Sequence, residues 1–358
     1  MSLYRSFPGL LLATCCLLLL GVGCLGGKAS PTGPDGGVYK MNISAATWQQ
    51  LKHHSVNGKI ASTGDMNIAS LAIDPQDAST LYAGTVDHGL LYSLDDGQSW
   101  MTPASAEVNT GRINAIAVHN KDKCVVYATR RNQVLKTSNC MRDWTKAFFD
   151  PKTDKVFTAL AIDWFNPAVV YAGTSEGDIF RSQDNGGSWK AVQRVQGFRI
   201  NNIAIDPKDS RILYVSTHGA GLVKSVDSGA TWDPIFKPFQ EFDQAKRVTQ
   251  VVIDPTSTQT IYTVSRYGIL KSVDGGTVWK ALALPNEPGS VEIRSLAVHP
   301  KNGKFLVYAT DASAVFSQDG GATWSARKLP TARGVSTLVF DQTAQPELFL
   351  GALTRPKN

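Results

Sequence analysis

The stretch Ser93-Leu94-Asp95-Asp96-Gly97-Gln98-Ser99-Trp100 decides the fold of this chain, because variants of it recur along the sequence. Its pattern is Ser-x-Asp-x-Gly-x-Ser/Thr-Trp, and three more copies match every fixed position: Ser182–Trp189, Ser225–Trp232 and Ser317–Trp324. Ser272–Trp279 departs only at Val278, whereas Thr137–Trp144 keeps the tryptophan but has Asn139, Met141 and Asp143 at other fixed positions. The six tryptophans are 43 to 47 residues apart, a period typical of a propeller or solenoid.

The residue types of the pattern indicate a tight hairpin turn. Glycine adopts positive φ without steric cost, the aspartate accepts hydrogen bonds from the turn, and the tryptophan buries a large ring. Nothing in the pattern is a reactive constellation, so we interpret its Asp and Trp residues as structural. These are Asp95, Trp100, Asp184, Trp189, Asp227, Trp232, Asp274, Trp279, Asp319 and Trp324.

Short apolar runs separate the turns and predict four strands in each repeat. The first repeat shows them at Ile68 to Ile73, at Thr80 to Thr85, at Gly89 to Ser93 and from Trp100 onward. The last repeat stops after two strands, Ser336 to Phe340 and Leu348 to Gly351. Residues 37–48 supply two more, with an eroded turn before Trp48.

Together the two ends complete one further repeat. We therefore predict an all-β fold: a seven-bladed β-propeller of four-stranded antiparallel blades over residues 36–354. Its last blade is closed by N- and C-terminal strands, which leaves only short edges exposed. Neither end shows the capping repeat that a solenoid needs.

The octapeptide resembles the Asp-box, or BNR repeat, of sialidases, tandem-propeller xyloglucanases, sortilin-type receptors and photosystem II assembly factors. The resemblance covers about residues 37–354 and implies the propeller fold. A single seven-bladed ring is most similar to the assembly-factor group, which implies a non-enzymatic scaffold. Because this fold hosts both enzymes and scaffolds, the resemblance specifies function weakly.

The N-terminus predicts export. Residues 1–23 combine Arg5 with the apolar run Leu10 to Leu20, as in a signal peptide. Leu20 to Cys24 resembles a bacterial lipobox, with Cys24 as the lipidated residue, although Gly21 stands where leucine is usual. Ordinary signal cleavage near Gly23 or Ala29 is the alternative. Residues 24–35 read as a flexible tether and residues 355–358 as a tail.

Composition agrees with an exported, cell-envelope protein. The net charge of +6 falls to +5 once residues 1–23 are removed, which does not favour nucleic-acid binding. We expect a monomer that contacts the membrane only through a lipid anchor, on the periplasmic side or at the cell surface, and that needs no cofactor or metal.

Cys124 and Cys140 flank a predicted hairpin with its turn near Asn132. We expect them to face each other across an antiparallel pair, within disulfide reach. An exported compartment permits the bond. It would replace the degenerate turn of this repeat and contribute roughly 3 kcal/mol.

Basic residues recur before the first strand of the repeats, on the face opposite the octapeptide turns. Arg112, Arg199 and Arg247 each stand seven residues before the residue that closes that strand, and Lys155, Arg294 and Arg333 lie near the equivalent place. Arg266 belongs to a loop between the second and third strands on the same face. Cations around a concave mouth focus potential on an anionic partner. The alternative is a set of solvated loop residues.

The same loops carry the carboxylates of the alternative function. A glycoside hydrolase or lyase needs two acids at a defined separation, and Asp87, Glu176 and Asp311 are the candidates. Phe198 to Asn201 is similar to the Phe-Arg-Ile-Pro motif of sialidases but lacks the proline and follows three octapeptides, so we give it no weight. The sequence favours a binding scaffold whose partner is a protein or an anionic glycan.

Overall fold

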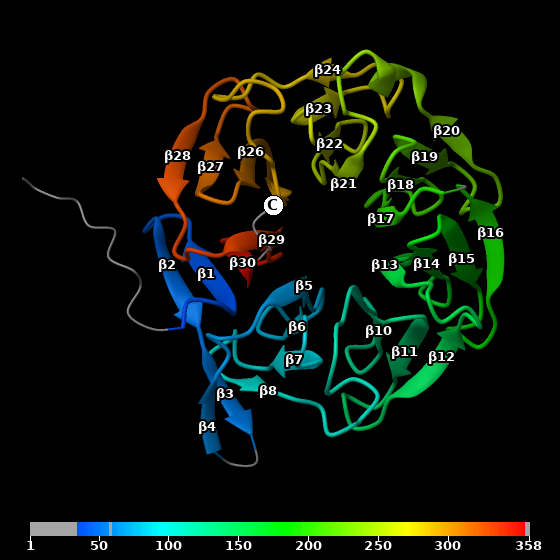
Figure 1. Cartoon of the computed structure of the whole chain (residues 1–358), viewed down its shortest axis with the longest axis vertical. Helices are drawn as coiled ribbons and strands as arrows, with labels where there is room; N and C mark the ends of the chain where they lie inside the picture. The colour runs from blue at the N-terminus through cyan, green and yellow to red at the C-terminus, as the bar shows by residue number, and fades with distance from the viewer. Residues whose placement is uncertain (1–33, 57–58, 196, 355–358) are drawn as a thin grey trace, which may run out of the picture.

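The computed structural model describes residues 34–56, 59–195 and 197–354. Their strands form seven sheets arranged in a ring, with four antiparallel strands in each blade (Figure 1), which confirms the predicted all-β propeller. The only helix of the described residues is the short 3-10 helix η1, Lys237–Gln240. No helix among them is both long and apolar enough to cross a bilayer. The predicted signal peptide, Cys24 and the tail lie outside the described residues.

Each blade runs from an inner strand at the channel to an outer strand at the rim. Blade 1 is β5 Ile68–Ile73, β6 Leu81–Thr85, β7 Leu90–Ser93 and β8 Trp100–Met101. Blade 2 is β9 Ile116–Val118, β10 Val126–Arg130, β11 Gln133–Thr137 and β12 Thr145–Phe149. Blade 3 is β13 Phe157–Ile162, β14 Val170–Thr174, β15 Asp178–Ser182 and β16 Lys190–Arg194.

The second half of the ring repeats the order. Blade 4 is β17 Ile200–Ile205, β18 Leu213–Thr217, β19 Leu222–Ser225 and β20 Asp233–Ile235. Blade 5 is β21 Val248–Ile253, β22 Ile261–Ser265, β23 Ile269–Ser272 and β24 Lys280–Ala281. Blade 6 is β25 Ser295–His299, β26 Asn302–Ala309, β27 Ser313–Ser317 and β28 Ser325–Lys328.

The two ends of the chain share the seventh sheet, the closing blade. Its strand order is β2 (Thr47–Leu51), β1 (Val38–Asn42), β30 (Leu348–Leu353) and β29 (Gly334–Phe340). In register, Lys40 lies opposite Phe349, and Met41 lies opposite both Leu348 and Trp48. The blue and red strands lie together in Figure 1. The predicted closure by N- and C-terminal strands is confirmed.

A hairpin that the sequence did not predict extends blade 1 outward. Strands β3 (His53–Val56) and β4 (Lys59–Ser62) form it, and β3 pairs in parallel with β8 through His54 and Trp100 (Figure 1). His53 is exposed, but His54 is buried and its Nε2 lies 3.0 Å from the Thr102 hydroxyl. His54 lies in the parallel pairing of β3 with β8, opposite Trp100.

The octapeptide turns have the predicted hydrogen bonds. In blade 3, Ser182 donates to Asp184 Oδ1 at 2.8 Å and accepts from the Gly186 N–H at 2.8 Å. The other carboxylate oxygen accepts the Ser188 hydroxyl at 2.6 Å. Asn185 and Gly186 both have positive φ, 56° and 85°. The hydrogen bonds from Ser188, with those from Ser182 and the backbone, lower the pKa of Asp184 to about 2.

The turns of blades 3, 4 and 5 are also held by the preceding blade. Tyr127 of β10 and Lys136 of β11 both donate to the carbonyl of Asn185, at 2.7 and 2.8 Å. Tyr171 and Arg181 hold Ser228, and Tyr214 and Lys224 hold Gly275 in the same way. We call this arrangement the tyrosine–cation clamp. It fixes the distance between neighbouring blades at the face of the turns.

The apolar core lies between the blades. The described residues form seven separate buried clusters, each shared by two neighbouring blades. Phe349, for example, packs with Val38 of the closing blade and with Leu81 and Trp100 of blade 1. No blade buries its faces alone, so the ring stabilises each blade through both neighbours.

Candidate functional site: the channel mouth

Polar side chains line the channel between the inner strands. They surround a hollow of about 250 Å³ with contributions from all seven blades. Several of them join neighbouring blades: Asn114 donates to the Phe157 carbonyl at 3.1 Å, and Asn201 donates to the Val248 carbonyl at 2.8 Å. Gln250 likewise exchanges two hydrogen bonds with the backbone of Leu296. These bonds hold the mouth above them in a fixed shape.

Three of the seven predicted mouth cations are neutralised. Lys155 is buried and its Nζ lies 2.7 Å from both Asp150 and Asp178. Burial alone would lower its pKa, but the hydrogen bonds that Lys155 donates to these two acids outweigh burial and raise that pKa. Asp178 also pairs with Arg194, so four charges compensate one another. Lys155 therefore stabilises blade 3 and presents no charge to a partner.

Arg294 and Arg333 are paired as well. Arg294 makes a bidentate contact with Asp311, at 2.8 and 2.6 Å, and a second ion pair with Glu292. Arg333 lies 3.2 Å from Asp35 and also donates to the Asn67 side chain. Asp35, the last residue of the predicted tether, is thereby docked on the closing blade.

The remaining cations are exposed and have no carboxylate within salt-bridge distance among the described residues: Arg112, Arg199, Arg247 and Arg266. Arg112 donates to Asn114 at 2.8 Å. Desolvation at the concave mouth lowers the pKa of Arg199, and the charge of Arg112 lowers it further. Desolvation also lowers the pKa of Arg112, and the negative charge of Asp87 opposes this lowering. Arg112 and Arg199 are therefore close enough to repel each other.

Arg247 joins the same side of the mouth through His218. The His218 N–H donates to the Arg199 carbonyl at 2.9 Å, and the His218 backbone forms an antiparallel bridge with Arg247. We call Arg112, Arg199 and Arg247 the basic crescent. It spans the loops before blades 2, 4 and 5, so the predicted ring of cations is an arc over part of the mouth. Arg266 lies in the β22–β23 loop, and no hydrogen bond or ion pair among the described residues joins it to the crescent.

The crescent has an apolar neighbour whose role the sequence did not show. The Phe198 ring packs on Gly219, where an added Cβ would lie 2.4 Å from the ring. Phe198 nevertheless keeps 38% of its surface exposed. The sequence placed Phe198 beside Arg199, but only the folded loops show that both lie against the loop of His218.

The candidate catalytic acids have different surroundings. Asp311 is held by Arg294, and none of Asp87, Glu176 and Asp311 lines the channel hollow. The negative charge of Asp87 opposes the lowering of the Arg112 pKa. The Glu176 carboxylate accepts a hydrogen bond from the neighbouring Ser175 hydroxyl at 3.5 Å. Within the described ranges, no three His, Cys, Asp or Glu residues are grouped as a metal site.

Cys124 and Cys140 form a disulfide. They lie beyond the ends of β10 and β11, where the Cys140 N–H also donates to the Cys124 carbonyl. In the other blades, the corresponding turn residue makes this backbone bond alone, as Asn185 does to Ala168. The disulfide thus adds a covalent link to a contact that the fold repeats.

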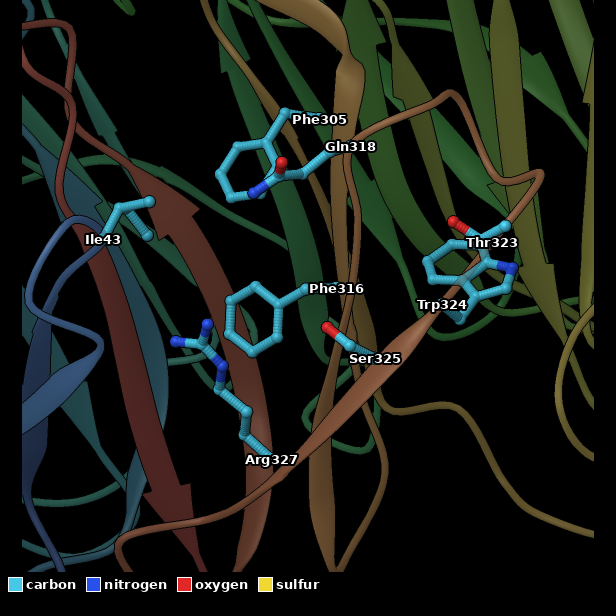
Figure 2. Close-up of a pocket in the computed structure, with 8 residues that line it drawn as sticks. All are labelled: Ile43, Phe305, Phe316, Gln318, Thr323, Trp324, Ser325 and Arg327. Carbon is cyan, nitrogen blue, oxygen red and sulfur yellow. The ribbon is translucent and has the colours of Figure 1, made fainter.

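A second hollow lies at the turn face between blade 6 and the closing blade (Figure 2). It measures about 340 Å³ and is lined by Ile43, Phe305, Phe316, Gln318, Thr323, Trp324, Ser325 and Arg327. The clamp is absent here because Val307 and Phe316 stand opposite each other where Tyr262 and Lys271 pair in blade 5. Arg327 instead lies 4.9 Å from the Phe316 ring centre.

Comparisons with known proteins show the fold. No protein-family model matches the chain, and no curated protein matches it. A GH74 enzyme from Niastella koreensis superposes with a TM-score of 0.64 at 16% identity, over 80% of this chain and 51% of that one. A structure described as YCF48 bound to D1 peptide has a TM-score of 0.63 at 16% identity, covering 82% and 94%.

A third similar structure is the extracellular domain of the putative one component system BT4673 from B. thetaiotaomicron. Its TM-score is 0.63 at 17% identity, over 80% of this chain and 37% of that one. The chain thus spans about half the length of the GH74 structure that it matches. Identities this low establish a shared propeller architecture and nothing further.

Proposed function

We propose that this protein is a non-enzymatic binding scaffold of the cell envelope, which captures an acidic segment of a partner protein at the basic crescent. We further propose that it is exported and anchored through a lipid on Cys24, as the lipobox resemblance implies. The propeller supplies rigidity, since its blades are joined through the channel and through the tyrosine–cation clamps.

One observation carries the proposal. Lys155, Arg294 and Arg333 each have carboxylate partners, whereas the three crescent arginines have none in the described part of the chain. Gathering unneutralised guanidinium groups costs electrostatic energy that an anionic partner would recover. Guanidinium groups also bind carboxylates with two parallel hydrogen bonds. The similar structure with a bound peptide supports a protein partner as the ligand class.

The test is capture of a labelled octa-aspartate peptide, followed by co-purification of partners from envelope extracts. Replacing Arg112, Arg199 and Arg247 with Ala should weaken peptide binding by roughly tenfold, since three rim charges at about 0.5 kcal/mol each contribute about 1.5 kcal/mol. The charge-matched control replaces the exposed Arg142, Lys301 and Lys328, which are not part of the crescent. Equal affinity of the two triple variants would refute the crescent as the binding site.

The alternative is a glycan-acting enzyme, which the similarity to GH74 structures keeps open. Hydrolysis needs two carboxylates at the cleavage point, and Asp87 and Glu176 are the candidates not held by an arginine ion pair. Turnover of xyloglucan or of a sialoside by the wild type, lost in both Asp87→Asn and Glu176→Gln, would favour this function. Absence of turnover together with peptide capture would favour the scaffold.

A further inference from the structure

His218 is fixed between two arginines of the basic crescent. Its backbone bonds to Arg199 on one side and to Arg247 on the other. Its loop is held in place because the Gly221 N–H donates to the Lys246 carbonyl at 3.0 Å and the Ala220 N–H donates to the Thr217 hydroxyl at 2.9 Å. Moving His218 away from either arginine would break these backbone contacts.

The surroundings of His218 oppose its protonation in the free protein. Desolvation, and then the charges of Arg247 and Arg199, lower its pKa, which favours the neutral imidazole. The charged groups that act on it are these two arginines, which come from the loops leading into β21 and β17. Both are cations, and neither has a carboxylate partner among the described residues.

The Phe198 ring packs against the loop that carries His218. It lies over Gly219, the residue next to His218, and only glycine leaves room for the ring. An anion that binds beside Arg199 and Arg247 would lie close to the His218 imidazole, because the backbone contacts hold the three residues together, and His218 is exposed to solvent. There the anion would replace repulsion between cations with attraction, which is stronger at lower effective dielectric.

We propose that His218 is a further ligand-binding residue of the crescent and takes up a proton when an anionic group binds between Arg199 and Arg247. This inference rests on the proposed function. Linkage is reciprocal: an anion that favours the protonated imidazole binds more tightly when the imidazole is protonated. Affinity therefore rises as pH falls from about 7.5 to 5.5, by up to about tenfold for each unit by which the bound anion raises the pKa.

The test measures affinity for the labelled octa-aspartate peptide at pH 7.5 and 5.5. Its carboxylates stay largely ionised across this range, since the ordinary pKa of Asp is about 3.9. The wild type should bind three- to tenfold more tightly at pH 5.5. His218→Gln should bind with the same affinity at pH 7.5 and at pH 5.5, because its side chain cannot take up the proton. The matched control, His53→Gln, changes an exposed histidine of the blade 1 hairpin and should keep the full gain.

Two further readouts separate the outcomes. Calorimetry in buffers of different ionisation enthalpy should show proton uptake by the wild type and none by His218→Gln, and the imidazole resonances of wild-type His218 should titrate at higher pH once peptide is added. A pH gain that survives in His218→Gln, or binding without proton uptake, overturns this inference and leaves the proposed function standing. A wild type that binds the peptide at neither pH overturns the proposed function itself.

Discussion

Tyr127 of blade 2 donates its phenolic hydroxyl to the backbone carbonyl of Asn185 in the turn of blade 3, at 2.7 Å. The two residues are 58 positions apart in the chain, and Lys136 reaches the same carbonyl. Because this contact recurs at Tyr171 and Tyr214, the clamp is a property of the repeat.

Removing one clamp hydroxyl should destabilise the ring. We expect Tyr127→Phe to lower the free energy of unfolding by about 1 kcal/mol, since it deletes one buried hydrogen bond and keeps the ring packing. Tyr308→Phe is the control, because no hydrogen bond of its hydroxyl is found in the described part of the chain. Urea denaturation of both variants measures the difference, and equal midpoints would contradict the role of the clamp.

Loss of a buried side chain from the closing blade should destabilise the protein as much as the same loss at any other core site. Phe349 is fully buried between the closing blade and blade 1, so Phe349→Ala should cost roughly 3–5 kcal/mol. Phe165→Ala removes a ring that is 69% exposed and should change stability by less than about 0.5 kcal/mol. A small loss for Phe349→Ala in urea denaturation would mean that the two chain ends contribute little to the ring.

Acid should weaken the turns. Hydrogen bonds from the turn hold the pKa of Asp184 and of Asp227 at about 2, below the value of about 3.9 in an unfolded chain. The folded state then binds fewer protons, so this contribution to stability is present above about pH 4 and is lost as the pH falls toward about 2.

Asp184→Asn should therefore lower stability at pH 7. Between pH 4 and 2 this variant should lose less stability than the wild type does. Asp154→Asn is the control, because Asp154 is exposed and no hydrogen bond of its carboxylate is found among the described residues. The midpoint of thermal unfolding, measured for each protein between pH 7 and 2, tests this prediction. Parallel profiles for the wild type and Asp184→Asn would show that the turn does not stabilise the ionised carboxylate.

The repeat made the architecture predictable, whereas the site depended on contacts between distant loops. Periodic tryptophans and the two half-repeats at the chain ends specified seven blades and their closure. The hairpin of β3 and β4 carries no such period, so neither it nor the burial of His54 could be foreseen. The spacing of the basic residues put Lys155 in the same predicted set as Arg199. It could not show that Lys155 would be buried in ion pairs with Asp150 and Asp178 while Arg199 stayed exposed.

Replacing Lys155 should change the stability of the protein, whereas replacing Arg199 should change its binding of the peptide. Lys155→Met leaves two buried carboxylates without their shared cation, so it should cost roughly 3–5 kcal/mol of folding free energy. It should leave capture of the octa-aspartate peptide unchanged in protein that remains folded. Arg199→Ala should do the reverse: stability within about 0.5 kcal/mol of the wild type and weaker capture. Urea denaturation and fluorescence anisotropy on the same preparations measure both quantities. If Lys155→Met weakened capture as much as Arg199→Ala without destabilising the fold, Lys155 would belong to the binding surface after all.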